Sequence, residues 1–137
     1  MLTINNSSDN GGVGDYANRI INAPNGFIEE NFAWASINGV NTLCGYIGDE
    51  ADLTLPANYK GENYVIKEKA FYDYESLTSV VIPHSVTSIG AYAFYGCSYL
   101  TNVIIGNGMI SIENSAFFNC GSLTSITIGT GVTSIGS

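Results

Sequence analysis

Three closely spaced carboxylates, Asp49, Glu50 and Asp52, come nearest to a chemical site in this 137-residue chain. Such a group could bind a cation or supply an acid–base pair. Catalytic carboxylates need a pocket that shifts their pKa values, and the surrounding sequence, GDEAD, gives no sign of one. We therefore expect a solvated turn at these residues.

His84 is the single histidine of the chain, and it follows Pro83. A catalytic histidine needs a nucleophile and an orienting acid nearby, and no Gly-x-Ser-x-Gly or comparable motif supplies them. One histidine cannot complete a zinc set, and the polar run 6–15 lacks the closing glutamate of a calcium loop. We therefore expect no enzymatic activity, no metal site and no cofactor, with His84 exposed in a turn.

The cysteines lead to the element that organises the chain. Cys97 and Cys120 lie 23 residues apart, and the residues around them recur at the same interval. The recurring positions are leucines, isoleucines and an Ala-Phe pair: Leu77, Leu100 and Leu123; Ile89, Ile112 and Ile135; Ala93-Phe94 and Ala116-Phe117. A fixed period of this length indicates a solenoid, in which each repeat is one coil stacked on the previous one.

Each coil has room for two short strands. Val80-x-Ile82 and Val86-x-x-Ile89 place apolar side chains on inward faces, and Pro83 turns the chain between them. We expect Ala93-Phe94 to lie on a single helical or 3₁₀ turn at the next corner. Burial of a large apolar side chain contributes roughly 1.5–3 kcal/mol, whereas ordering one residue's backbone costs roughly 1–2 kcal/mol. A coil of 23 residues therefore cannot be stable alone and must pack on its neighbours.

Stacking should bring Cys97 and Cys120 to about 5 Å from each other, the spacing of neighbouring strands. Side chains stacked in this way point in parallel directions, which is poor disulfide geometry. No Cys-x-x-Cys pair is present to indicate a redox or zinc motif. We therefore expect free thiols at both positions.

The chain divides into three parts. Residues 1–31 begin rich in Asn, Gly and Ser, and we expect them to be partly mobile. Residues 32–52 predict a β-hairpin and turn, with the hairpin signal at Asn38-Gly39, and this hairpin should cap the first coil. Residues 53–137 hold about three and a half coils; the first carries four extra residues near Lys60–Asn63, and the last is incomplete.

The repeat L-T-S-V-x-I-P-x-S-V-T-S-I-G-x-x-A-F-x-G-C resembles the BspA-like leucine-rich repeats of bacterial surface proteins. The resemblance covers about Asp52–Ser137 and is specific, because the spacing, the S-I-G turn and the A-F and G-C pairs all recur. Glu113 and Asn119 replace glycines of the motif. The resemblance implies a mostly β solenoid with short helical or 3₁₀ turns. It also implies an extracellular or cell-surface location and adhesion to host extracellular-matrix proteins or other cells.

Charge is concentrated in the first part of the chain. All four Lys and Arg residues and eleven of the twelve Asp and Glu residues lie within residues 1–76. Residues 77–137 are therefore nearly uncharged, whereas nucleic acids and anionic membranes select lysine and arginine. No apolar run approaches the roughly 20 residues of a membrane span, and Met1-Leu2-Thr3 does not begin a signal peptide. We expect no nucleic-acid partner and no membrane insertion.

Two surfaces are candidate binding sites. Outward positions of the first strand in each coil should form a low-charge sheet face, which solenoids commonly use for binding but which could equally be plain surface. An aromatic column beside the core phenylalanines could bind a partner or cover the corner as packing, and packing is favoured. The sheet face comprises Ser79, Val81, Asn102, Ile104, Ser125 and Thr127, and the aromatic column comprises Tyr72, Tyr95 and Phe118.

These features favour a protein-interaction or adhesion module of a bacterial cell-surface or secreted protein. The alternatives are a structural or self-assembling spacer and an accessory region of a larger multidomain protein. The final coil starts at Leu123 and stops at Ser137, so the strand at Ser125–Ile128 is an expected sheet edge. No Lys, Glu or Pro protects this edge. We therefore expect either an end-to-end homodimer through the C-terminal coil, with the same surface on both sides, or a chain that is a piece of a longer array of coils.

Overall fold

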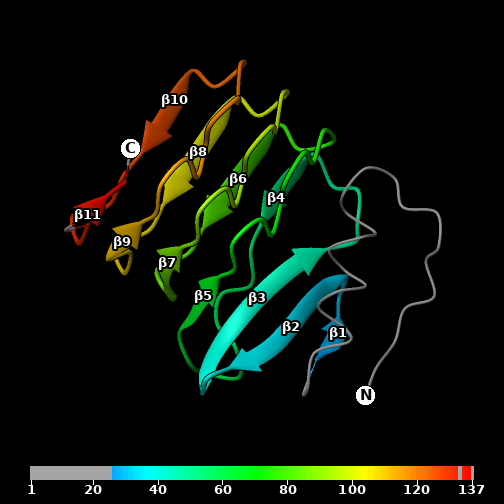
Figure 1. Ribbon diagram of the computed structural model, residues 1–137, viewed down its shortest axis with the longest axis vertical. Coiled ribbons are helices and arrows are strands. Elements are labelled where there is room, and N and C mark those ends of the chain that lie inside the picture. The colour runs from blue at the N-terminus through cyan, green and yellow to red at the C-terminus, as the bar shows by residue number, and fades with distance from the viewer. Residues whose placement is uncertain (1–25, 133, 137) are drawn as a thin grey trace.

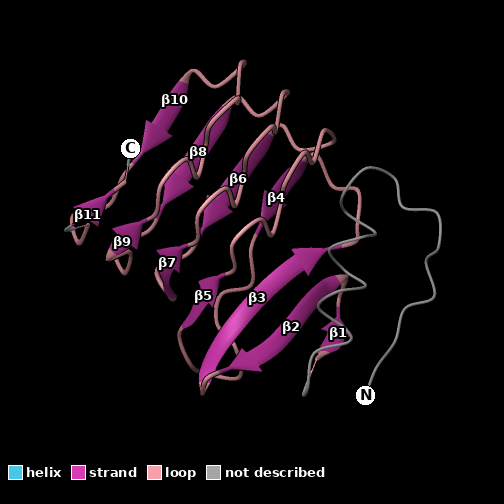
Figure 2. Ribbon diagram, viewed as in Figure 1, coloured by secondary structure: helices cyan, strands magenta, loops and turns pink. Residues whose placement is uncertain are grey.

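The computed structural model describes residues 26–132 and 134–136, which form strands and turns in two sheets (Figure 1). No helix is present in this part of the chain (Figure 2). One sheet has the strand order β1-β2-β3-β5-β7-β9-β11, and the other has the order β10-β8-β6-β4. The strands are β1 (Phe27–Glu29), β2 (Phe32–Ile37), β3 (Val40–Tyr46), β4 (Asp52–Thr54), β5 (Tyr64–Ile66), β6 (Ser79–Ile82), β7 (Val86–Ile89), β8 (Asn102–Ile105), β9 (Ser111–Ile112), β10 (Ser125–Thr127) and β11 (Ser134–Ile135).

The predicted solenoid is confirmed, because each coil adds one strand to each sheet. β6 and β8 pair in parallel with Val80 beside Val103, and β7 and β9 pair in parallel with Ile89 beside Ile112. Both pairs join residues that are 23 apart, so the sequence period is also the register of stacking. Figure 1 shows the successive coils lying side by side in chain order.

The corners between the sheets are not the helical or 3₁₀ turns expected at Ala93-Phe94. Tyr92 and Gly96 have positive φ angles of 59° and 75°, whereas a right-handed helix needs negative φ at every residue. The backbone N–H groups therefore alternate in direction. Ala93 donates within the corner to the carbonyl of Gly90 (3.2 Å), while Phe94 donates to the carbonyl of Ala116 in the next coil (2.8 Å).

The same left-handed position recurs in every corner and explains one departure from the repeat motif. Asp73, Gly96 and Asn119 occupy equivalent positions with φ of 56°, 75° and 63°. Asparagine and aspartate tolerate this conformation better than other residues that have a Cβ. Asn119 can therefore replace the glycine of the motif without changing the corner.

A column of aromatic rings runs along the inside of the corner. Phe71 and Phe94 stack with ring centroids 4.8 Å apart, and Phe94 and Phe117 stack at 5.2 Å. Tyr46 of β3 continues the column toward the N-terminus, with its ring 6.3 Å from that of Phe71. Gly48 lies one repeat before Phe71, and a Cβ at Gly48 would clash with the Tyr46 ring. The hairpin thus supplies the aromatic ring of this layer from Tyr46, in place of a ring at position 48.

The capping hairpin forms as predicted and becomes part of the larger sheet. β2 and β3 pair around Asn38-Gly39, where both residues have positive φ, as a two-residue hairpin turn requires. β3 then pairs in parallel with β5 of the first coil. Segment 1–31 contributes β1 to the edge of this sheet, and the polar run 6–15 lies outside the described residues.

The four extra residues of the first coil form a small hairpin of their own. Tyr59 and Glu62 exchange backbone hydrogen bonds of 2.8 and 2.9 Å across a turn at Lys60-Gly61. The turn places the Tyr59 ring 4.9 Å from that of Trp34, which lies in the capping hairpin. The insertion therefore strengthens the contact between the cap and the first coil.

Replacing Phe94 with alanine should lower the free energy of unfolding by about 3–5 kcal/mol, because its fully buried ring lies between two others in the column. Thermal or urea unfolding followed by circular dichroism measures this loss. Phe118→Ala is the matched control, since the Phe118 side chain is 57% exposed. Equal stability of the two variants would contradict the assignment of Phe94 to the core.

Candidate interaction surfaces

The structure aligns the six predicted sheet-face residues in two rows across β6, β8 and β10. Ser79 lies beside Asn102, and Asn102 beside Ser125; Val81 lies beside Ile104, and Ile104 beside Thr127. The Ile104 side chain is 41% exposed, Val81 is half-buried, and Ser125 and Thr127 are exposed. The rows form a continuous surface without a charged side chain on these three strands.

Both rows continue onto β4, which the sequence-based prediction did not include. Asp52 lies beside Ser79, and Thr54 lies beside Val81. The Asp52 carboxylate accepts hydrogen bonds from Ser79 Oγ (2.8 Å) and Thr78 Oγ1 (3.1 Å). The 27-residue offset between the first two coils was the signal that could have placed Asp52 and Thr54 in these rows from the sequence.

The other two acids of the GDEAD segment, Asp49 and Glu50, are exposed in the turn that was expected. The backbone N–H of Glu50 donates to Tyr46 Oη at 3.4 Å. This bond ties the turn to the aromatic ring that heads the core column. The segment therefore joins the cap to the first coil and does not gather its carboxylates around a pocket.

The aromatic column is ordered by stacking. The rings of Tyr72 and Tyr95 are 4.8 Å apart and nearly parallel, and those of Tyr95 and Phe118 are 5.7 Å apart. Lys69 Nζ lies 5.9 Å from the centre of the Tyr72 ring. Most ring faces are therefore covered by other rings of the column, and the 57% exposed Phe118 at its end is the most accessible member.

His84 contributes its backbone to coil packing. Its side chain is exposed, and a Cβ at Gly106 or Gly108 of the next coil would clash with the His84 backbone. Glycine is needed at these two positions because the loops of successive coils approach so closely. Among the described residues, no group of three His, Cys, Asp or Glu side chains is placed to hold a metal ion.

The repeated cysteines are hydrogen-bond donors between coils. Each thiol donates to a backbone carbonyl 26 residues earlier: Cys97 Sγ to Phe71 at 3.1 Å and Cys120 Sγ to Phe94 at 3.1 Å. Tyr74 makes the equivalent bond in the first coil, from its hydroxyl to the carbonyl of Gly48. All three cysteines are free thiols. The Gly-Cys pair of the motif thus satisfies a carbonyl at each corner.

Several ionisable side chains are held in their neutral form. Burial raises the pKa of the Cys44 thiol to about 12, against a smaller opposite effect of Lys67. A hydrogen bond with Cys120, together with burial, raises the pKa of the Cys97 thiol above its usual range. Burial likewise raises the pKa of Tyr64 and of Tyr74. These thiols and phenols are therefore protonated at neutral pH and are poor nucleophiles.

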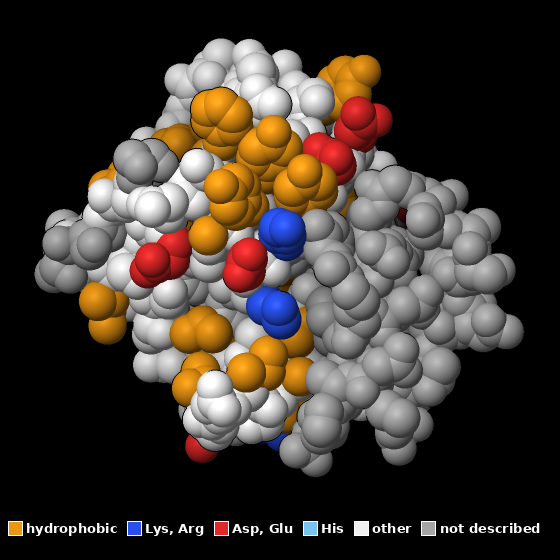
Figure 3. Space-filling view, viewed as in Figure 1, with side chains coloured by type: hydrophobic (Ala, Val, Ile, Leu, Met, Phe, Trp, Pro, Cys, Tyr) orange, Lys and Arg blue, Asp and Glu red, His pale blue; other side chains and the backbone are white. Residues whose placement is uncertain are grey.

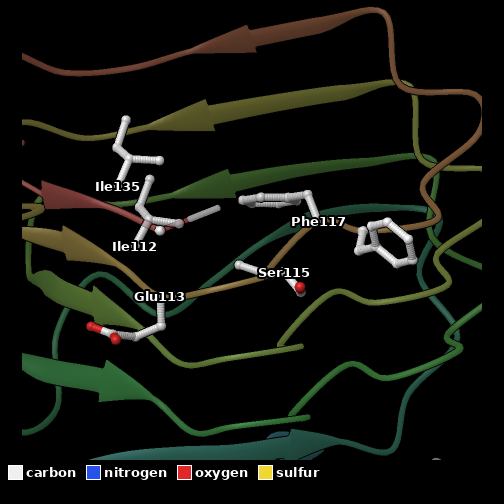
Figure 4. A pocket seen from close by; sticks show the side chains of 8 residues that line it. Ile112, Glu113, Ser115, Phe117 and Ile135 are labelled. Carbon is white, nitrogen blue, oxygen red and sulfur yellow. The ribbon is translucent and has the colours of Figure 1, made fainter.

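An open pocket of about 240 Å³ lies at the last described corner (Figure 4). Its lining is mostly apolar and comes from two successive coils: Ile112, Glu113, Ser115, Ala116, Phe117, Phe118, Ile135 and Gly136. In Figure 4 the side chains of Ile112, Ile135 and Phe117 lie together, and the Glu113 carboxylate points away from Phe117.

A smaller pocket of about 90 Å³ lies at the cap, between β2 and the Tyr59–Glu62 hairpin. Its lining mixes aromatic rings with Glu29, Asn58 and Lys60. Lys60 Nζ lies 5.4 Å from the ring centres of both Phe27 and Tyr59, so the chain's own cation already contacts these rings.

Figure 3 shows one face of the molecule on which charged side chains lie between two groups of hydrophobic ones. No helix in the described part of the chain could cross a membrane.

Residues 64–137, more than half of the chain, match the BspA type leucine rich repeat region in six copies. Three crystal structures are similar. A leucine rich cell surface protein from Faecalibacterium prausnitzii is 32% identical to this chain, with a TM-score of 0.69. The T. pallidum leucine rich repeat protein is 29% identical, with a TM-score of 0.72. A leucine-rich repeat protein from Bacteroides capillosus is 30% identical, with a TM-score of 0.71.

The alignments cover 82%, 81% and 82% of this chain, respectively. They cover 33% of the Faecalibacterium chain, 53% of the T. pallidum chain and 88% of the Bacteroides chain. This chain therefore spans about a third and about half of the first two proteins. Among curated protein sequences, none matches significantly.

The protein should lose stability in alkaline solution. Raised pKa values mean that the folded chain binds these protons more tightly than the unfolded chain. The stability that Cys44 contributes is therefore fully present below its usual pKa of 9.0 and is lost as the pH rises toward 12. Melting temperatures recorded between pH 7 and pH 11 should fall above pH 9, and less steeply in Cys44→Ala. A constant melting temperature over this range would contradict the burial of these groups.

Proposed function

Because this chain belongs to the BspA-type leucine-rich-repeat family, we propose that it is a protein-interaction module of a bacterial cell-surface or secreted protein. The binding surface is the outer face of the four-stranded sheet, and its partner is a protein such as a host matrix or cell-surface protein. The observation that carries this proposal is the pair of continuous rows across β4, β6, β8 and β10. The Faecalibacterium relative, a leucine rich cell surface protein, supports the location.

The chemistry of the rows indicates the kind of partner. Hydroxyl and amide groups of Ser79, Asn102 and Ser125 form one row, and Ile104 projects from the other. Asp52 supplies the single charge, and Ser79 Oγ and Thr78 Oγ1 hold its carboxylate in place. Such a surface fits a partner with a neutral, mixed polar and apolar patch. Its affinity should therefore depend little on salt, unlike binding driven by charge.

The size of the face limits the affinity. Four strands at the usual spacing span about 14 Å, so the two rows cover on the order of 200–300 Å². A stable interface needs about 800 Å² on each partner. The rows must therefore be the centre of a larger footprint or bind weakly. The adjacent threonines Thr78, Thr101 and Thr124 extend the surface, since each hydroxyl bonds to a carbonyl of the preceding coil.

A second candidate function is a structural or self-assembling segment, including the end-to-end homodimer expected from the sequence. The observation that favours it is the edge strand β10, near which Ile126 and Ile128 are 40% and 43% exposed. Light scattering over a dilution series tests this function. A single monomeric species at high concentration would exclude it.

Ile104→Lys should weaken partner binding at least tenfold with little change in melting temperature, because the side chain is exposed at the centre of the face. Surface plasmon resonance against purified collagen, laminin and fibronectin measures the affinity. Thr87→Lys on the opposite sheet is the matched control and should bind as the unmodified protein does. Equal affinities of the two variants for a bound matrix protein would remove the sheet face as the site and direct attention to Phe118.

Salt separates this interaction from adsorption through the charged residues 1–76. Affinity that holds between 50 and 500 mM NaCl, while the Debye length falls from about 14 Å to about 4 Å, supports the uncharged face. Affinity that falls more than tenfold over this range would contradict it.

A further inference from the structure

The small pocket at the cap is lined by aromatic rings and carboxylates, the two kinds of group that attract an organic cation. We propose that it binds the guanidinium group of an arginine side chain on a partner protein. All lining residues fall between positions 29 and 60, in the cap and the first coil. The site is therefore separate from the sheet face and does not depend on the function proposed for that face.

The register of β1 and β2 brings a carboxylate to the aromatic rings. The two strands pair antiparallel, with Phe27 beside Trp34 and Glu29 beside Phe32. Side chains directly opposite each other, and those two residues apart along a strand, lie on the same face of a sheet. Glu29 therefore shares its face with three aromatic side chains. Glu30, in the turn that follows β1, also lines the pocket.

The aromatic rings around the pocket are held in place by their neighbours. The centroid of the Tyr59 ring lies 4.9 Å from that of Trp34 and 6.0 Å from that of Phe27. Trp34 also packs edge-on against the ring of Tyr64 at 4.9 Å, and the Tyr64 hydroxyl donates to the carbonyl of Pro56 at 2.7 Å. The rings are therefore ordered before a ligand arrives, which reduces the entropy cost of binding.

A cation of the chain itself shows what these rings attract. Lys60 Nζ lies 5.4 Å from the ring centres of both Phe27 and Tyr59, within the range of a cation–π interaction. Lys60 is exposed in the turn of the small hairpin, and its long side chain is flexible.

The charges around the pocket leave it negative. Glu29 and Glu30 outnumber Lys60, and both carboxylates are exposed. In the described part of the chain, no hydrogen bond or ion pair occupies either carboxylate. A cation from another molecule is therefore attracted to the pocket, and the Lys60 side chain can move into solvent to admit it.

The size of the pocket and its carboxylates select a guanidinium group. A volume of about 90 Å³ corresponds to about three molecules of liquid water, which is enough for the head group of one side chain. A guanidinium group is planar, so it stacks on an aromatic face while its N–H groups donate to carboxylates. A trimethylammonium group binds aromatic rings but has no N–H to donate, and a lysine ammonium is more strongly hydrated. Arginine is therefore the ligand that uses both features of the pocket.

The peptide acetyl-Gly-Arg-Gly-amide tests the proposal, and Trp34 is the reporter because it is the single tryptophan of the chain. At constant ionic strength, the peptide should change the Trp34 fluorescence and shift its indole N–H signal in a saturable way at millimolar concentration. The same peptide with citrulline, which is neutral and nearly the same shape, should bind at least tenfold more weakly. Equal binding of the two peptides, or no change at tens of millimolar arginine peptide, would overturn the proposal.

Two further ligands separate a guanidinium group from other cations. Acetyl-Gly-Lys-Gly-amide and tetramethylammonium chloride carry the same charge without the planar donors, so each should bind more weakly than the arginine peptide. Binding of either one as tightly as the arginine peptide would overturn the assignment to arginine.

Protein variants locate the site. Glu29→Gln removes a carboxylate of the pocket and should weaken binding of the arginine peptide severalfold, whereas Lys60→Ala removes the competing cation and should strengthen it severalfold. Glu50→Gln is the matched control, because it removes an exposed carboxylate of the GDEAD turn and should leave binding unchanged. Equal effects of Glu29→Gln and Glu50→Gln, or weaker binding in Lys60→Ala, would contradict the assignment.

The variant Ile104→Lys distinguishes this site from the sheet face. It should leave binding of the arginine peptide unchanged, because Ile104 lies in the four-stranded sheet and the pocket residues Glu29 and Trp34 lie in or beside strands of the other sheet. Loss of peptide binding in Ile104→Lys at an unchanged melting temperature would place the arginine site on the sheet face and overturn the proposal.

Discussion

The structure depends on contact between successive coils. A coil of 23 residues buries too few large side chains to offset the entropy of ordering its backbone, and half of the N–H groups in its corners point out of the coil. Both deficits are removed by the neighbouring coil, which supplies carbonyl acceptors and apolar contacts. The period of the sequence, the register of the strands and the stacking of the phenylalanines are consequences of this one contact.

Because the contact has a direction, the two ends of the stack are chemically different. At the first coil the hairpin Phe32–Tyr46 replaces a preceding coil: β3 pairs with β5, and Tyr46 supplies the next ring of the column. Gly48 leaves space for that ring. At the last described corner, an open apolar pocket lies beside Phe117.

The same repetition shapes the surface of this chain. Each residue type recurs in a row, so the solenoid displays rows of similar side chains and few convergent sets of different ones. Cys97 and Tyr74, which could have been reactive in isolation, donate to carbonyls between coils and have raised pKa values. The sheet face stays accessible, with the exposed Ile104 at its centre and Asp52 as its single charge.

The amino-acid sequence by itself determined the solenoid, its 23-residue register, the hairpin at Asn38-Gly39 and which residues face outward from β6, β8 and β10. These follow from local patterns, since strand alternation and equal spacing specify which side chains stack. The corner conformation was predicted wrongly, because its positive φ angles arise from hydrogen bonds to another coil. Only the tertiary structure decided that Tyr46 heads the core column and that Asp52 joins the sheet face. Both depend on contacts between segments whose spacing departs from the 23-residue repeat, so the repeat alone does not specify them.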